Sequence, residues 1–137
     1  MLVARPATEA DVPFVLSSFV HDAKRAPSMS YLERGQTRSL MCALLKNAEW
    51  NVTILADDGT PDEIFGFVVW RSPTEIAWIH TKGIYRGKGL RIASRLLAAI
   101  GAVPGPINVV FLSTGKFSKW ARTKGWKLKH QPYGCLF

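Results

Sequence analysis

The sequence predicts a single α/β domain that occupies all of residues 1–137. A chain of 137 residues is long enough for one hydrophobic core and too short for two ordinary domains. Hydrophobic residues make up 47% of the chain and charged residues 20%, which is the composition of a globular protein. Segments of strand and helix periodicity also follow one another in the order β-α-α-β-β-β-α-β-α-β.

The first part of the chain predicts one strand and two helices. Leu2–Arg5 forms a short opening strand, and Thr8–Asp11 is a helix-capping signal followed by apolar residues at helical spacing. The segment His21–Ser28 is predicted as a loop. Ser30–Glu33 can cap a second helix, whose apolar side ends at Leu45.

Three extended segments follow these helices. Trp50–Ala56 and Glu63–Trp70 flank the turn-rich stretch Asp57–Asp62, a pattern typical of a hairpin. Glu75–Thr81 is the third extended segment. Alternation along a strand predicts that Ile76, Trp78 and His80 of that segment face one way.

The remaining elements are read from a glycine-rich run to the C-terminus. Lys82–Leu90 leads into a helix that continues to about Ile100. Ile107–Leu112 is a continuous apolar run, as in a buried parallel strand. Lys116–Lys124 predicts a short helix, and Trp126–Phe137 predicts one or two closing strands.

Positive charge is concentrated in the second half of the chain. The formal net charge is +8, yet all ten acidic residues lie within residues 1–75. Residues 76–137 contain eleven Lys and Arg and no Asp or Glu. This distribution indicates a polyanionic partner: a phosphorylated cofactor, a nucleic acid, or both.

The sequence lacks the patterns of membrane-spanning, secreted, disulfide-rich and metal-binding proteins. No apolar run approaches the roughly 20 residues of a membrane span, and the start MLVARPATEADVP lacks a signal-peptide core, so we expect a cytoplasmic protein without membrane contact. Two cysteines make no disulfide framework. Because no CxxC or His/Cys ligand spacing is present, we expect no metal site.

The strongest local motif is Tyr85–Leu90, placed between a strand and a helix. Gly87 and Gly89 allow the backbone to turn and to approach a ligand closely, and a helix N-terminus favours a pyrophosphate. A glycine turn with solvated basic residues is the alternative interpretation. No Gly-Lys-Ser/Thr closes the loop, which disfavours a nucleotide triphosphatase. The positive side chains here are Arg86, Lys88, Arg91 and Arg95.

The run TKGIYRGKGL at residues 81–90 resembles the acetyl-CoA motif of the GNAT superfamily of N-acetyltransferases, Arg or Gln followed by x-x-Gly-x-Gly/Ala. Arg86 and Gly89 occupy matching positions, and Lys124–Trp126 is similar to the family's Gly-aromatic step before the last strands. The resemblance covers essentially the whole chain and extends to small GNAT-like proteins carried by bacteriophages. It implies a mixed central sheet of about six or seven strands flanked by about four helices.

The resemblance also implies a cofactor and a site. The cofactor is acetyl-CoA, and the acceptor is an amine-bearing small molecule, a peptide or a modified nucleotide. In the family, backbone N–H groups freed where a strand splays pair with the pantetheine arm, and the motif holds the pyrophosphate. The helix pair between Thr8 and Asn47 should form the acceptor side. The residues expected to bind the cofactor are Thr81, Lys82, Gly83, Arg86, Gly87, Lys88, Gly89, Leu90 and Arg91.

Acyl transfer to an amine needs a general base, because an ammonium ion is not a nucleophile. Imidazole has a suitable intrinsic pKa and His80 lies close to the expected thioester, although a packed histidine beside Trp78 is the alternative. Glu75 is a second candidate base, and Tyr133 is a candidate acid. Many family members carry a Tyr as acid where this chain has Ala121.

Two departures from the family motif leave a second hypothesis open. These are Ala121 and Arg91, which stands where the motif ends in Gly or Ala. They favour an inert GNAT-like binding or phage virion-associated protein. A third hypothesis, a nucleic-acid-directed acyltransferase or DNA-modification enzyme, comes from Lys116–Lys129, where basic and aromatic residues interleave. An amphipathic helix with Phe117, Trp120 and also Trp126 in the core explains the same pattern.

Overall fold

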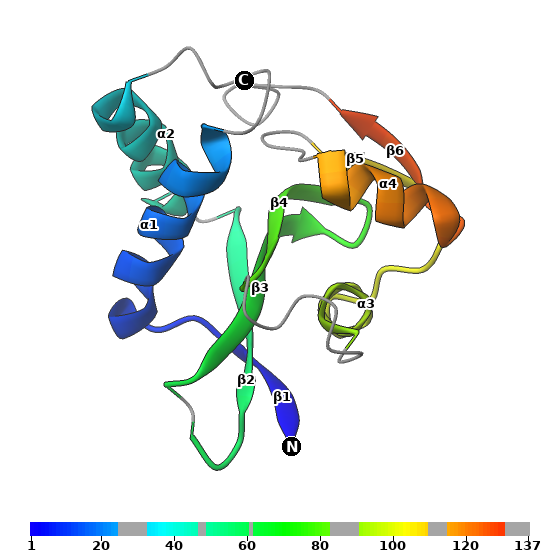
Figure 1. The fold of residues 1–137 in the computed structure, drawn as a ribbon, viewed down its shortest axis with the longest axis horizontal. Helices are drawn as coiled ribbons and strands as arrows, with labels where there is room; N and C mark the ends of the chain where they lie inside the picture. The colour runs from blue at the N-terminus through cyan, green and yellow to red at the C-terminus, as the bar shows by residue number, and fades with distance from the viewer. Residues whose placement is uncertain (25–32, 47–48, 61, 83–90, 110–114, 131–137) are drawn as a thin grey trace.

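The computed structural model describes residues 1–24, 33–46, 49–60, 62–82, 91–109 and 115–130. A twisted sheet lies between two pairs of helices (Figure 1). The elements are β1 (Leu2–Pro6), the single 3-10 turn η1 (Glu9–Asp11), α1 (Val12–Ala23), α2 (Arg34–Lys46), β2 (Asn51–Asp57), β3 (Ile64–Ser72), β4 (Glu75–Thr81), α3 (Ile92–Ala99), β5 (Pro106–Val109), α4 (Gly115–Thr123) and β6 (Lys127–His130).

The sheet confirms the predicted α/β class and the predicted order of elements. Its six described strands run in the order β1-β2-β3-β4-β5-β6. Strands β1 to β4 pair antiparallel, whereas β4 with β5 and β5 with β6 pair parallel. The sheet is therefore mixed, and the parallel crossovers pass through α3 and α4, as such connections require.

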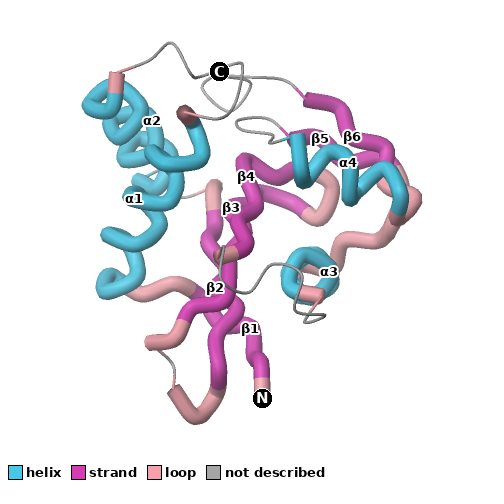
Figure 2. The backbone as a smooth tube through the Cα atoms, viewed as in Figure 1, coloured by secondary structure: helices cyan, strands magenta, loops and turns pink. Residues whose placement is uncertain are grey.

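The two faces of the sheet carry separate cores. Along β2 and β3, Ile54 and Phe67 pack toward α1 and α2, whereas Leu55 and Val68 pack toward α3 and α4. Figure 2 shows the strands between these two helix pairs. Successive side chains of a strand point to opposite faces, so each inner strand supplies both cores.

A register shift in β4 changes which residues share a face. Val69 pairs with Trp78, but the next residue of β3 pairs with Ile76, so Ala77 is an additional residue. Trp78 packs with the α1 side and Ile76 with the α3 side. The prediction that these two residues face one way is therefore wrong. His80, two residues beyond Trp78, lies on the α1 side, where its ring contacts Phe14 of α1.

Polar contacts fix the start of α1. Asp11 accepts hydrogen bonds from Arg5 Nη1 (2.7 Å) and Nη2 (3.0 Å), and from the Thr8 backbone N–H at 2.7 Å. The Arg5 guanidinium lowers the pKa of the Asp11 carboxyl to about 2, despite the burial of that carboxyl. The predicted capping signal at residues 8–11 therefore stabilises the start of α1 mainly through the contacts of Asp11.

Helix α1 is longer than the sequence predicts. His21–Ala23 continues the helix, so the loop expected from residue 21 is wrong in that part, and residues 25–28 lie outside the described chain. The buried face runs on through Phe19, Asp22 and Ala23. A buried Asp carries no hydrophobic signal, and for this reason periodicity ended the predicted helix too early.

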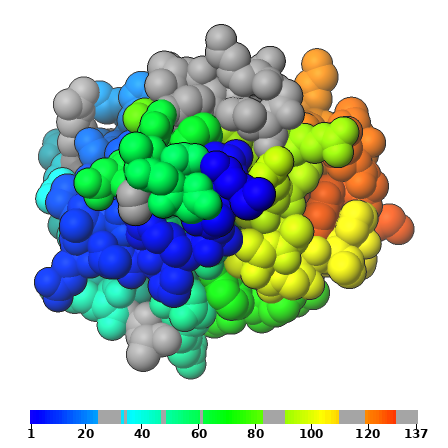
Figure 3. All heavy atoms as spheres, turned by 90° about the horizontal axis from the view of Figure 1, so that it is seen from below, coloured from blue at the N-terminus to red at the C-terminus, as the bar shows by residue number. Residues whose placement is uncertain are grey.

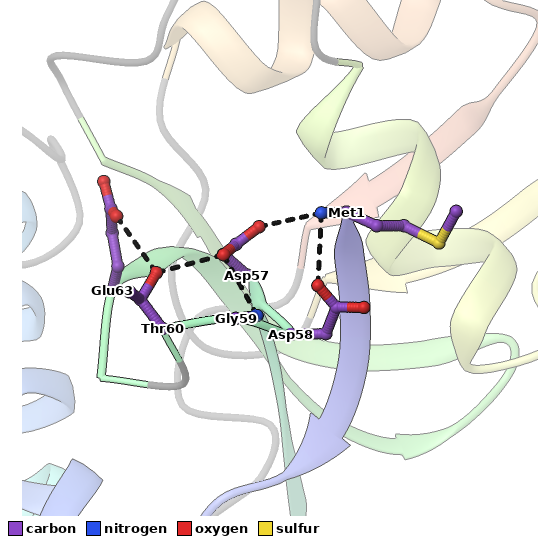
Figure 4. A network of polar contacts seen from close by, with 6 residues as sticks. All are labelled: Met1, Asp57, Asp58, Gly59, Thr60 and Glu63. Carbon is purple, nitrogen blue, oxygen red and sulfur yellow. Dashed lines mark hydrogen bonds and ion pairs between the residues drawn. The ribbon is translucent and has the colours of Figure 1, made fainter.

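The N-terminal ammonium group of Met1, just before the edge strand β1, forms ion pairs with the connection between β2 and β3. It contacts Asp57 Oδ1 at 2.9 Å and Asp58 Oδ1 at 3.2 Å (Figure 4). The neighbouring ammonium lowers the pKa of Asp57. The first residues lie beside α3 (Figure 3), and Leu2 packs against the core on that side. Within the described residues, no helix is long and apolar enough to cross a membrane.

Candidate functional site: the end of β4 beneath α1

The candidate site lies where the C-terminal end of β4 passes beneath α1. His80 is 8% exposed there, and Thr81 and Lys82 after it are half-buried. The strand holds these residues by pairing with β3, Phe67 opposite His80 and Gly66 opposite Thr81. The expected glycine-rich loop begins directly afterwards.

Asp22 from the last turn of α1 contacts two side chains of β4. His80 Nδ1 lies 2.8 Å from Asp22 Oδ2, and Trp78 Nε1–H donates to the same oxygen at 3.1 Å. Residues two apart on a strand share a face, so both donors meet the helix that covers that face. The structure thereby brings together a carboxylate and an imidazole separated by 58 positions in sequence.

Aromatic rings enclose the imidazole of His80. The Phe67 ring stacks on it with centroids 5.2 Å apart and an interplanar angle of 29°. Phe14 of α1 meets it edge-on at 6.2 Å, and the Lys82 ammonium lies 6.0 Å from the centroid of that same Phe14 ring. The alternative considered from sequence, a histidine packed beside Trp78, describes the burial correctly but not the ion-pair partner.

The backbone beyond Trp78 has a defined orientation. The Lys82 N–H donates to the Phe65 carbonyl at 2.9 Å, so Lys82 and His80 present their backbone groups to β3. Alternation then directs the N–H groups of Ile79 and Thr81 toward the β5 side. In the described residues β4 pairs with β5 only through Glu75 and Ile76, at the start of β4.

Gly66 allows three elements to meet at this place. A Cβ there would lie 2.5 Å from the His80 carbonyl oxygen and 2.8 Å from Ile92 Cγ2. Real Cβ atoms do not approach other atoms so closely, so no larger residue fits without movement. The missing side chain therefore lets the first turn of α3 pack against β3 beside the end of β4.

Arg91 has a left-handed backbone directly before α3. Its φ is 53° and ψ is 43°, a conformation that Gly adopts freely and other residues adopt at a cost. It is the motif position where the family has Gly or Ala. Arg91 and Arg95 are both exposed on this end of α3. A helix N-terminus with exposed guanidinium groups favours an anionic group.

Of the remaining sequence positions considered for the site, two are described by the structure and the others are not. Glu75 lies at the opposite end of β4 from His80 and is paired there with Arg71, which raises the pKa of that guanidinium. Ala121 is fully buried in α4. Outside the described residues lie Gly83, Arg86, Gly87, Lys88, Gly89, Leu90 and Tyr133.

The helix pair predicted as the acceptor side carries a surface hollow of about 420 Å³ between α1 and α2. Its basic lining residues are His21, Lys24 and Arg38. Asp22 does not line it, because adjacent helical positions point about 100° apart.

The segment 116–129, where basic and aromatic residues interleave, contains most of α4 and the first part of β6. Trp126 is buried and Trp120 packs half-buried against the same core, as the amphipathic interpretation predicts. Its exposed cations are Lys119, Arg122, Lys124, Lys127 and Lys129, which we call the basic face.

Asp22 is the residue of the candidate site that sequence reasoning missed. It follows Val15 and Phe19 at helical spacing, so a longer helical reading would have placed it on the buried side. A carboxylate at a buried helical position needs a partner, and that requirement is the signal that could have found it.

Comparison with known proteins agrees with this architecture. No family model matches the sequence, and no curated protein sequence does either. A solved structure described as a possible acetyltransferase from Clostridium difficile 630 is 13% identical with a TM-score of 0.63, covering 97% of this chain and 95% of that one.

Two further solved structures are similar. The ribosomal-protein-alanine N-acetyltransferase from Brucella melitensis is 16% identical with a TM-score of 0.50, covering 96% of this chain and 80% of its own. An acetyltransferase of the GNAT family from Staphylococcus aureus Mu50 is 11% identical with a TM-score of 0.50, covering 73% and 63%. The chain has the fold of GNAT acetyltransferases.

Proposed function

We propose that the chain is a CoA-dependent N-acyltransferase that moves an acyl group, most simply acetyl, to an amine. The observation that carries this proposal is the contact between the His80 imidazole and the Asp22 carboxylate. His80 lies at the end of β4, and one loop separates this strand from α3. In the fold of this chain, that loop is the segment that resembles the acetyl-CoA motif. Arg86–Arg91 would hold the pyrophosphate, and Thr81–Gly83 would line the pantetheine arm.

The residues of the chain have two tasks in this reaction. A bound acyl-CoA would supply the acyl group as a thioester, and its C–S bond would break as the carbonyl carbon bonds to the amine nitrogen, with CoA leaving as a thiolate. His80 Nε2 accepts the proton that the attacking nitrogen loses. The same imidazolium can return that proton to the departing sulfur, which removes the need for the acid missing at Ala121. The N–H groups of Ile79 and Thr81 face the side where the thioester carbonyl would lie.

Calorimetric titration with acetyl-CoA tests this function directly. Binding should raise the melting temperature by mass action, and Arg86→Ala should weaken it by about 1–3 kcal/mol, the scale of lost charge-assisted hydrogen bonds. A mass-spectrometric search for acylated amines in a lysate then identifies the acceptor. Absence of binding at millimolar acetyl-CoA would reject the enzyme and leave the inert GNAT-like binding protein.

Arg91→Gly is expected to separate stability from cofactor binding. Glycine removes the cost of the left-handed backbone, so the free energy of unfolding should rise by about 1 kcal/mol. If the guanidinium contacts a phosphate, acetyl-CoA affinity should fall about tenfold, the effect of losing about 1.4 kcal/mol. Thermal denaturation and calorimetry measure the two quantities on the same sample.

Arg95→Gln is the matched control for that variant. It removes an exposed positive charge from the same helix without changing the backbone conformation, so stability should stay within about 0.5 kcal/mol. An Arg91→Gly protein that is more stable and binds acetyl-CoA as well as the wild type would show that the Arg91 guanidinium does not contact a phosphate.

The basic face supports a second candidate function, acyl transfer directed to a nucleic acid. Its five exposed cations lie on neighbouring elements, and no carboxylate of the described residues forms an ion pair with them. Duplex binding through this face should weaken with salt, with a log–log slope of about −0.9 per phosphate neutralised. Changing Lys119, Arg122 and Lys129 together to Gln should reduce that slope.

The control changes Lys24, Arg38 and Lys46 to Gln, an equal loss of exposed charge at the end of α1 and in α2. It should leave the slope unchanged, and both triple variants should keep acetyl-CoA affinity. Fluorescence anisotropy with duplex and single-stranded oligonucleotides between about 50 and 200 mM salt measures the slope. No binding at the low-salt end leaves the basic face as a solvated surface.

A further inference from the structure

Asp22 is a buried carboxylate whose partners come from a different element. It is 5% exposed, and its Oδ2 accepts the Trp78 indole N–H at 3.1 Å and lies 2.8 Å from His80 Nδ1. Both partners are themselves buried, at 1% and 8% exposure. Taking an ionised carboxylate out of water is costly, and an apolar residue packs a helix onto a sheet without that cost. Packing of α1 alone therefore does not call for a carboxylate here.

The donors around Asp22 determine where the imidazole proton lies. An indole nitrogen can only donate, so Oδ2 acts as an acceptor. An ionised carboxylate offers no proton of its own, so the hydrogen between it and His80 belongs to Nδ1. A neutral imidazole carries one proton, and the lone pair is then left on Nε2.

The surroundings of His80 also fix the plane of its ring. Phe67 stacks on one face, and Phe14 meets the ring edge-on. Asp22 fixes the remaining rotation, because turning the ring over would remove Nδ1 from the carboxylate. The ring is therefore held with one defined nitrogen for proton transfer.

We propose that Asp22 is the positioning residue of this site: it fixes the His80 tautomer with Nε2 as the proton acceptor and stabilises the imidazolium that forms when Nε2 takes the amine proton. The proposal rests on the acyl-transfer function proposed above. Asp22 touches neither acceptor nor thioester in this account, and it acts only through His80. The proton stays on the imidazole, so the carboxylate need not accept it.

Nitrogen-15 NMR of the histidine rings tests the tautomer without any reaction. At a pH where imidazoles are neutral, the His80 signals should show a protonated Nδ1 and a bare Nε2, with His80→Gln used for assignment. Asp22→Ala removes the oxygen that Trp78 and Nδ1 share, so the bare nitrogen should shift partly or wholly to Nδ1. Trp78→Phe removes the other hydrogen bond to Asp22 and should keep the wild-type tautomer.

Steady-state kinetics with acetyl-CoA then tests the consequence. Asp22→Asn should lower kcat by 10- to 1,000-fold with less than a threefold change in acetyl-CoA affinity, and Asp22→Glu should recover part of kcat. A purely structural role would instead lower the melting temperature and leave the kcat of the folded fraction unchanged.

The outcomes separate this proposal from the proposed function. A wild-type His80 with a bare Nδ1 overturns the role of Asp22, whether or not the chain transfers acyl groups, and this measurement needs no variant to fold. An unchanged tautomer in Asp22→Ala together with an unchanged kcat in Asp22→Asn overturns it as well. The expected tautomer in a chain that neither binds nor uses acetyl-CoA removes the acyl-transfer function and leaves the hydrogen bond between His80 and Asp22 as a structural contact, which also overturns the role proposed here.

Discussion

His80→Gln is expected to lower the turnover of acyl transfer by about 10²- to 10⁴-fold, the usual contribution of a positioned general base. Gln can keep a hydrogen bond to Asp22 but cannot take up a proton. The acidic limb of the pH–rate profile should therefore disappear or move. Acetyl-CoA affinity should stay nearly constant, because His80 directs its backbone groups to β3 and its side chain to α1. Stopped-time product analysis across pH and calorimetry give the two measurements.

Glu75→Gln in the same assay distinguishes the two candidate bases. Glu75 is paired with Arg71 at the start of β4, five residues along the strand and roughly 17 Å from His80, at about 3.3 Å per residue. We expect Glu75→Gln to reduce turnover less than tenfold. Unchanged turnover in His80→Gln together with a large loss in Glu75→Gln would reverse the assignment.

The fold could be predicted because its signals are local. Apolar spacing of 3.6 or 2 residues is visible within a dozen positions, and it predicted the order of the ten α-helices and β-strands of the described residues. Boundaries were less accurate where a polar residue is buried. Asp22 interrupts the apolar pattern of α1, and the predicted loop from residue 21 follows from that interruption.

The candidate site was predicted only in part because its contacts are not local. His80 was identified from its chemistry and its place before the motif, but its partner lies on an element that approaches only after the sheet has formed. The additional residue Ala77 in β4 decides which side chains share the face of His80, and no pattern in one strand reveals such a shift. The left-handed backbone of Arg91 is equally invisible, because Arg rarely adopts it.

Gly66→Ala is expected to destabilise the protein by about 1–3 kcal/mol, the usual cost of overpacking. The added methyl group would lie 2.5 Å from the His80 carbonyl oxygen, a backbone atom that cannot rotate away, and 2.8 Å from Ile92. Relief requires β4 to move from β3 or α3 to move from the sheet. Both movements act at the place where the imidazole and the start of α3 are held, so turnover should fall more than stability alone predicts. Chemical denaturation and kcat at saturating acetyl-CoA measure these effects.

Gly35→Ala provides the matched control for Gly66→Ala, because it makes the same chemical change on a helix with open space around it. Nothing lies within 4 Å of a Cβ at Gly35 in α2. Alanine favours a helix over glycine by about 0.5–1 kcal/mol, so this variant should be slightly more stable than the wild type. Opposite signs for the two substitutions would show that the close approach of β3, β4 and α3 is responsible. A Gly66→Ala protein as stable and as active as the wild type would mean that α3 is not packed closely against the end of β4. The proposed positions of His80 and the CoA phosphates depend on that packing and would then be wrong.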